Sequence, residues 1–191
     1  MGLLGWLTGR GSGGDTRLTA WRREWTAAAA EPDEQAVDCL RARLEALGLA
    51  EEDIEIEREM LDGIGQLAQL RSSVVTGIPV LETGHRVVGH DVCHFSTPVS
   101  MPDDAAQPSG RLFLTNARVI FAGGARSTTV AWHAVGDVLH ADRDVLLVRR
   151  DRGTIYRFRC NTYADAMCGA FLARRLSSVR TRVAGKSATR T

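Results

Sequence analysis

The chain has 191 residues, of which 44% are hydrophobic and 25% are charged, as is usual for globular proteins and unlike disordered chains. No stretch of the sequence reaches the roughly 20 apolar residues that a membrane-spanning helix needs. The net charge of +1 hides an asymmetry, because residues 1–80 carry 8 basic and 14 acidic side chains and residues 81–191 carry 16 and 9. This asymmetry indicates a basic tail, an anionic partner, or attraction between the two halves.

Residues 1–16 are predicted to form a flexible N-terminus. The segment from Met1 to Leu7 is apolar but too short for the core of a signal peptide, and Gly9 to Gly14 has the composition of a flexible linker. We therefore expect a cytoplasmic protein, with peripheral contact between its apolar terminus and a membrane as the alternative.

Apolar residues then recur at steps of three and four through residues 17–73, which predicts a helical region of three helices. The first helix places Trp21 and Trp25 on one face. The second ends at Gly48, a residue that tolerates the left-handed conformation. The third spans about 51–70, and the helix dipole favours the acidic residues of its first turns.

From residue 74 the pattern changes to short β-branched runs separated by turn residues. Residues 74–86 are expected to connect the helical region to a β-domain at residues 87–176. The β-domain should contain seven strands, at residues 87–95, 111–115, 118–122, 128–132, 135–141, 145–150 and 154–160.

A helix should close the β-domain. Thr162 and Asp165 stand at the spacing of a capping box, and apolar residues line one face as far as Leu176. The sequence after that residue is polar and basic, so residues 177–191 are predicted to be a disordered basic tail.

The last hairpin offers a candidate interaction face. A three-residue loop at 151–153 would pair Arg150 with Thr154 and direct Leu146 and Val148 toward the core. Three aliphatic residues rimmed by arginine would then point outward, which suggests a covered surface. The predicted face consists of Val145, Leu147, Arg149, Ile155, Arg157 and Arg159. We expect the N-terminal helices to dock on it, in the same chain or across a homodimer.

One hairpin resembles a known family. The segment Gly110-Arg-Leu-Phe-Leu-Thr-Asn-Ala-Arg-Val-Ile-Phe121 is similar to the Gly-x-Leu-x-Leu-Thr hairpin of GRAM-type domains in the PH-like superfamily, whose return strand begins with Arg. A two-residue turn at Asn116-Ala117 would place Leu112 and Phe121 on the inner face.

The resemblance covers roughly the C-terminal half of the chain and implies an α+β fold. A PH-like antiparallel β-barrel or sandwich of about seven strands, capped by a C-terminal helix, would follow the helical region. It also implies binding of lipid, peptide or protein without catalysis. The loop expected at residues 96–109 contains no Lys or Arg. Phosphate recognition needs charge-assisted donors, so we expect no phosphoinositide at that loop.

A metal site is a further alternative, since His85, His90, Cys93 and His94 are zinc-type ligands within ten residues. Strand alternation would direct His90 and His94 to one side and Cys93 to the other, so we expect no metal there. The sequence shows no catalytic motif, and we expect neither catalytic residues nor a cofactor.

These observations favour a non-catalytic binding module, either protein-binding or a peripheral-membrane adaptor. The alternatives are a nucleic-acid or other polyanion-binding protein that uses the Arg-rich C-terminal half, and a metal-binding protein that uses the His/Cys cluster. Nucleic acid is the weaker alternative because Phe113 is the only obvious platform on which a base could stack.

Overall fold

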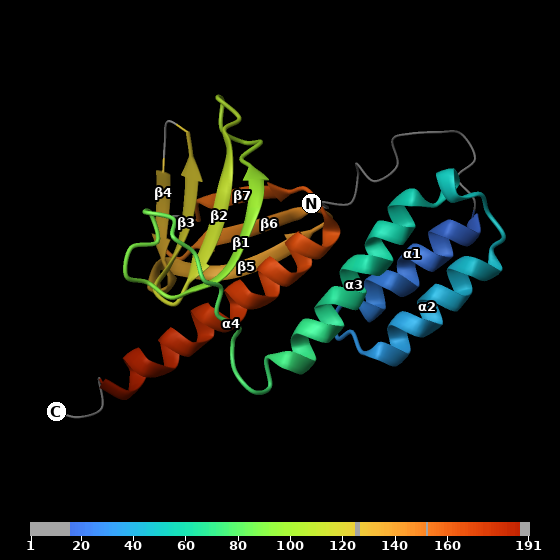
Figure 1. The fold of residues 1–191 in the computed structure, drawn as a ribbon, viewed down its shortest axis with the longest axis horizontal. Coiled ribbons are helices and arrows are strands. Elements are labelled where there is room, and N and C mark those ends of the chain that lie inside the picture. Colours follow the sequence, from blue (N-terminus) through green and yellow to red (C-terminus); the bar gives the residue numbers. More distant parts are fainter. Residues whose placement is uncertain (1–15, 125–126, 152, 188–191) are drawn as a thin grey trace.

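The structure is a computed structural model that describes residues 16–187 except 125, 126 and 152, and for residues 179–187 it describes the backbone alone. Three helices come first, with a short 3-10 turn before the third (Figure 1): α1 (Thr16–Ala28), α2 (Glu34–Ala46), η1 (Glu51–Asp53) and α3 (Glu55–Ser73). The predicted N-terminal helical region is therefore confirmed. The predicted flexible terminus lies outside the described residues, apart from Thr16.

The two tryptophans of α1 hold the three helices together. Trp21 is buried and its indole N–H donates to the carbonyl of Leu40 in α2 at 2.9 Å, while Trp25 donates in the same way to Met60 in α3 at 2.8 Å. A buried indole needs such an acceptor, because an unpaired N–H in the core costs free energy. Asp33 caps α2 by accepting a hydrogen bond from the backbone N–H of Ala36 at 2.7 Å.

A seven-stranded antiparallel sheet follows, in the order β4-β3-β2-β1-β7-β6-β5. The strands are β1 (Cys93–Ser100), β2 (Ser109–Thr115), β3 (Arg118–Gly123), β4 (Ser127–Ala131), β5 (Val135–Ala141), β6 (Asp144–Arg149) and β7 (Ile155–Cys160), with a 3-10 turn η2 (Trp132–Ala134) after β4. The helix α4 (Tyr163–Ser187) ends the fold. The predicted PH-like α+β architecture is confirmed, but the sheet is not closed into a barrel, because β4 and β5 form two separate edges.

The inner face of the sheet packs against α4. The predicted β2–β3 register is confirmed, since Leu112 lies opposite Phe121 and Leu114 opposite Val119, all of them buried. Small residues of α4, among them Ala166, belong to the same apolar core and let the helix approach the strands closely. Figure 1 shows α4 running along the sheet, between the strands and the helical bundle.

Three boundaries differ from the sequence prediction. The first strand begins at Cys93 rather than residue 87, because two tight turns occupy the preceding segment: Val88 N–H bonds to the carbonyl of His85, and Asp91 N–H to that of Val88. The strand continues to Ser100, so the loop without Lys or Arg shortens to residues 101–108.

The closing helix is longer than predicted. It continues past Leu176 to Ser187, in place of the disorder predicted for that stretch, and residues 188–191 lie outside the described part. No proline interrupts the sequence after Thr162, so the helical hydrogen-bond ladder can continue. No helix in the described residues is long and apolar enough to cross a membrane.

The helical bundle docks on α4, not on the last hairpin. Met167 and Cys168 of α4 are buried in the core of the bundle. Glu59 of α3 accepts a hydrogen bond from the backbone N–H of Tyr163 at 2.9 Å and forms an ion pair with Arg143, whose guanidinium lies 5.5 Å from the Tyr163 ring centroid. The prediction that these helices cover the last hairpin of the same chain is therefore wrong.

Candidate interaction surface

The outer face of β5, β6 and β7 carries a group of aliphatic side chains that no segment of the described residues covers. Leu139 lies opposite Leu146, and Val148 lies opposite Ile155. Leu139 is 43% exposed and Ile155 is 55% exposed, while Leu146 and Val148 are half-buried. We call these four residues the outer patch. Neighbouring cross-strand positions are close enough for their side chains to form one continuous apolar surface.

The outer face of β2 and β3, in the other half of the sheet, is covered by the chain itself. Phe113 and Ile120 point to the outer side, and each is 1% exposed. Val88, which is 2% exposed, and Cys93 pack on them in a small separate core. The segment between α3 and β1 thus folds over this half as a cover.

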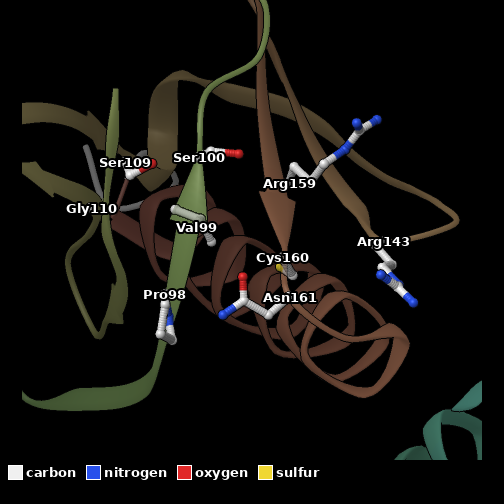
Figure 2. A pocket seen from close by; sticks show the side chains of 9 residues that line it. All are labelled: Pro98, Val99, Ser100, Ser109, Gly110, Arg143, Arg159, Cys160 and Asn161. Carbon is white, nitrogen blue, oxygen red and sulfur yellow. The ribbon is translucent and has the colours of Figure 1, made fainter. Parts of the chain in front are cut away.

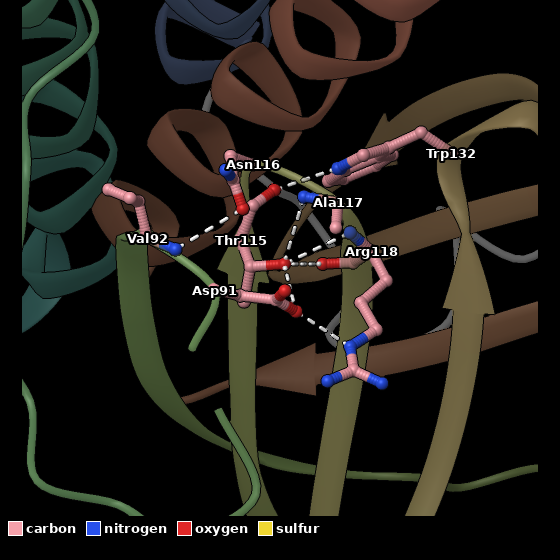
Figure 3. A network of polar contacts seen from close by, with 7 residues as sticks. All are labelled: Asp91, Val92, Thr115, Asn116, Ala117, Arg118 and Trp132. Atoms are coloured by element: carbon pink, nitrogen blue, oxygen red, sulfur yellow. Dashed lines mark hydrogen bonds and ion pairs between the residues drawn. The ribbon is translucent and has the colours of Figure 1, made fainter. Parts of the chain in front are cut away.

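A polar network holds this cover on the β2–β3 turn (Figure 3). The carboxylate of Asp91 accepts a hydrogen bond from Nε of Arg118 at 2.7 Å and lies 3.3 Å from the hydroxyl of Thr115. Val92 N–H donates to the side-chain oxygen of Asn116 at 3.2 Å, and Asn116 N–H donates to the Val92 carbonyl at 2.8 Å. Because the network joins segments far apart in sequence, it fixes the cover to the sheet.

The same network explains how the two-residue turn forms without glycine. The hydroxyl of Thr115 accepts hydrogen bonds from the backbone N–H groups of Ala117 and Arg118, at 3.2 and 3.0 Å. The indole N–H of Trp132 donates to the Thr115 carbonyl at 2.8 Å. Side-chain bonds of this kind replace part of the backbone pairing that a turn would otherwise need.

The last hairpin differs from its predicted register by one residue. Val148 lies opposite Ile155 and Val145 opposite Phe158, whereas the prediction pairs Val148 with residue 156. Gly153 does adopt the left-handed conformation, with φ of 60°. The loop is longer than three residues because the backbone N–H of Arg150 leaves the hairpin and bonds to the carbonyl of Ala134.

This shift corrects the predicted interaction face. Val145 and Leu147 are each 1% exposed and belong to the inner core, because a one-residue slip moves side chains to the opposite face. Arg149 forms a bidentate ion pair with Asp151 in the loop. Ile155 does lie on the outer face, as do the two arginines predicted there: Arg157 and Arg159. The sequence interpretation missed Leu139, Leu146 and Val148, although alternation would have found them with the correct register.

The two arginines beside the outer patch share one carboxylate, which offsets part of their positive charge. Asp144 accepts hydrogen bonds from Nε of Arg157 at 2.7 Å and from Nε of Arg159 at 3.0 Å, and its side chain is only 6% exposed. The hydrogen bond that Arg159 donates to Asp144 raises the pKa of Arg159 above its usual value. Asp103 adds a weaker contact to Arg157 at 3.4 Å. On the opposite margin, Asp137 of β5 is exposed.

An open pocket of about 700 Å³ lies where β1 meets β7 (Figure 2). The two guanidinium groups at its rim extend away from Ser109, and each is engaged by a carboxylate: Arg143 by Glu59 and Arg159 by Asp144. Burial raises the pKa of the Cys160 thiol to about 12. A thiol with so high a pKa is protonated near neutral pH, which disfavours its use as a thiolate nucleophile.

The four candidate metal ligands do not converge. The His85 ring lies 4.8 Å from the Phe113 ring, and Nδ1 of His94 lies 2.7 Å from the Pro79 carbonyl. The thiol of Cys93 donates to the backbone carbonyl of Phe95, and His90 is exposed. No group of three or more acidic, His or Cys side chains in the described part of the chain is placed to share a metal ion.

The surface features proposed for nucleic-acid binding are mostly engaged inside the protein. Phe113, the candidate stacking platform, is buried under the cover. Arg118, Arg149 and Arg157 each form an ion pair with an aspartate. Arginines paired in this way contribute less to polyanion binding, because a phosphate must displace the partner carboxylate.

No protein-family model and no curated protein matches the chain. The C-terminal domain of a protein from Leishmania infantum matches with 11% identity and a TM-score of 0.41, over 48% of this chain and 89% of that one. Inner Membrane Complex Sub-compartment Protein 1 from Toxoplasma gondii matches with 10% identity and a TM-score of 0.40, over 60% and 92%.

A DH/PH fragment of PDZRHOGEF, solved in complex with human RhoA, matches with 11% identity and a TM-score of 0.40. The match covers 85% of this chain and 53% of that one, so the chain spans about half of that fragment. The PH-like assignment rests on the strand order and on α4 rather than on these low scores.

Proposed function

We propose that the chain is a non-catalytic, cytoplasmic protein-binding module with a GRAM-type β2–β3 hairpin, and that it binds its partner through the outer patch. One observation carries this proposal. Within the described part of the chain, the outer face of a single sheet is covered by other residues over β2 and β3 and is left exposed over β5 to β7, where four aliphatic side chains gather.

The energetics favour a protein partner at this surface. Complete burial of an aliphatic side chain stabilises an association by about 1.5–3 kcal/mol. Leu139 and Ile155 are each about half exposed, so each can still contribute part of this free energy when a partner covers it. The ion pairs at the margin contribute less because they are partly exposed. Fully desolvated aliphatic residues with a polar rim are typical of protein interfaces.

A membrane surface fits the patch less well. Anionic lipid headgroups attract unpaired basic residues, whereas Arg157 and Arg159 share the carboxylate of Asp144 and exposed Asp137 lies on the opposite margin. We therefore assign the patch to a protein partner.

Site-specific photo-crosslinking tests this function. A benzophenone amino acid at position 155, in the full chain inside cells that produce it, should form adducts with discrete protein partners. The same amino acid at position 75, where Val75 is 81% exposed outside the patch, is the matched control. Adducts at 155 should disappear when Leu146→Asp is added. Equal labelling at both positions, or labelling that is unaffected by Leu146→Asp, would overturn the proposal.

A further inference from the structure

The register of the last three strands defines the outer face as a grid of nine residues. Asp137, Val148 and Ile155 form the first row, and Leu139, Leu146 and Arg157 form the second. The third row consists of Ala141, Asp144 and Arg159. Leu146 therefore occupies the centre of the grid.

The charges on this grid are balanced and lie at opposite corners. Asp137 stands at one corner, exposed, and Arg159 stands at the diagonally opposite corner with 47% of its side chain exposed. Two arginines and two aspartates in the grid give no net charge. A neutral face carries no long-range repulsion against an identical face, unlike a face of one sign.

The arrangement is self-complementary. A two-fold axis along the diagonal from Ala141 to Ile155 brings each Leu146 onto the Leu146 of a second copy. The same operation brings Asp137 of each copy to Arg159 of the other and lays the aliphatic stem of Arg157 over Val148. It also sets Leu139 of each copy beside Asp144 of the other, whose carboxylate is already engaged by Arg157 and Arg159. The strands of the two copies then cross at a large angle, closer to the orthogonal than to the aligned arrangement of packed sheets.

The chain's own helices are not available to cover this face. The bundle is held on α4 through Glu59, Arg143 and Tyr163, on the far side from the outer patch. We infer that the occupant of the outer patch is a second copy of this chain, bound face to face as a two-fold symmetric dimer. This inference rests on the proposed function, since it names the partner of the same surface.

Sedimentation velocity of the full chain over a range of micromolar concentrations tests the dimer. Wild type should show a reversible monomer–dimer equilibrium. Leu146→Asp places a charge at the centre of the apolar contact, and Ile155→Asp places one at its edge. Each substitution should therefore raise the dissociation constant by about tenfold or more. Val75→Asp adds the same charge outside the patch and should leave the equilibrium unchanged. Far-UV circular dichroism melts should confirm that each variant stays folded.

A charge reversal tests the orientation of the two copies. Asp137→Arg should weaken the dimer by placing two arginines together, and added salt should reduce the difference from wild type. Glu55→Arg makes the same change at an exposed site of α3 and should have no effect.

Two outcomes contradict the inference: a wild type that remains monomeric at every concentration, or a dimer that persists in both Leu146→Asp and Ile155→Asp. The mass of the photo-adduct at position 155 separates this inference from the proposed function. An adduct of two chains supports the dimer. Patch-dependent adducts to another protein, with a monomeric wild type, overturn the dimer and leave the proposed function standing. The absence of any patch-dependent adduct overturns both.

Discussion

The outer face of the sheet is buried over β2 and β3 and exposed over β5 to β7. Over β2 and β3, Phe113 and Ile120 lie beneath Val88 and are as buried as residues of the main core. Over β5 to β7, Leu139 and Ile155 have similar chemistry but remain exposed in the described chain. An alternating apolar pattern therefore makes a second core only where another segment of the chain returns to cover it.

In the covered half, a carboxylate joins the covering segment to the sheet. Asp91 ties the cover to Arg118 and Thr115, far away along the sequence. In the exposed half, Asp144 at the start of β6 bonds instead to two arginines of the neighbouring strand. The contacts of Asp91 hold a separate segment on the sheet, whereas the contacts of Asp144 only join two neighbouring strands.

The strongest test compares two neighbouring leucines of β6 that face opposite sides. Leu147→Ala should lower the free energy of unfolding by about 2–5 kcal/mol, since it opens a cavity beside Phe158 in a core where Leu147 is 1% exposed. Leu146→Ala, on the outer face, should cost about 1 kcal/mol or less in the monomer. Urea unfolding measures both. Equal losses would show that the outer face is as closely packed as the inner one.

Glycines in the two halves provide the next comparison. A methyl group at Gly110 would press into the backbone carbonyl of Ala122 on β3, so Gly110→Ala should lower the free energy of unfolding by about 1–3 kcal/mol. At Gly136 the corresponding methyl would lie 3.3 Å from Cα of Arg150, a tighter than usual contact that a small shift can relieve. In thermal unfolding, Gly110→Ala should have a lower melting temperature than Gly136→Ala. The reverse order would contradict the close strand approach at Gly110.

A smaller change on the outer face separates the covered half from the exposed half directly. Ile120→Val should lower the free energy of unfolding by about 0.5–1.5 kcal/mol, because Ile120 is enclosed by the cover. Ile155→Val should have almost no effect on the monomer, since Ile155 is 55% exposed. Urea titrations at low protein concentration measure the pair. A negligible loss in Ile120→Val would mean that the cover opens in solution.

The smallest expected effect is a pH dependence at the inner side of β5. Burial lowers the pKa of His140, and the nearby Arg174 lowers it further, although Asp142 and Asp144 act in the opposite direction. The unfolded chain therefore binds a proton before the folded one as pH falls through about 6.5, so this histidine makes the protein less stable on acidification.

His140→Gln keeps a side-chain donor for the Asp142 carbonyl, which lies 2.8 Å from Nε2 of His140, and removes the titration. The loss of stability between pH 7.5 and pH 5.5 should be smaller in this variant than in wild type. His133→Gln changes an exposed histidine and should follow the wild-type profile. An identical profile for His140→Gln and wild type would contradict the assignment.

The two hairpins show how far sequence reasoning reaches. The turn at Asn116-Ala117 is predicted correctly, because hydrogen bonds to the neighbouring Thr115 and Arg118 complete it locally. The register of the last hairpin is predicted wrongly. At its loop, the backbone N–H of Arg150 bonds to the carbonyl of Ala134, a residue from an earlier turn, and the local sequence pattern does not reveal such a contact. The one-residue difference in register exchanges the faces of β6, so the candidate surface contains Leu146 and Val148 in place of Val145 and Leu147.

Local patterns in the sequence are enough to predict the helical region, the seven strands and the closing helix. These follow from the periods of local apolar patterns, which depend on backbone geometry alone. Tertiary structure decided the rest: the open sheet, the cover over Phe113, the docking of the bundle on α4 and the composition of the outer patch. Each of those depends on contacts between residues distant in sequence, and a one-residue shift in such a contact changes which side chains meet solvent.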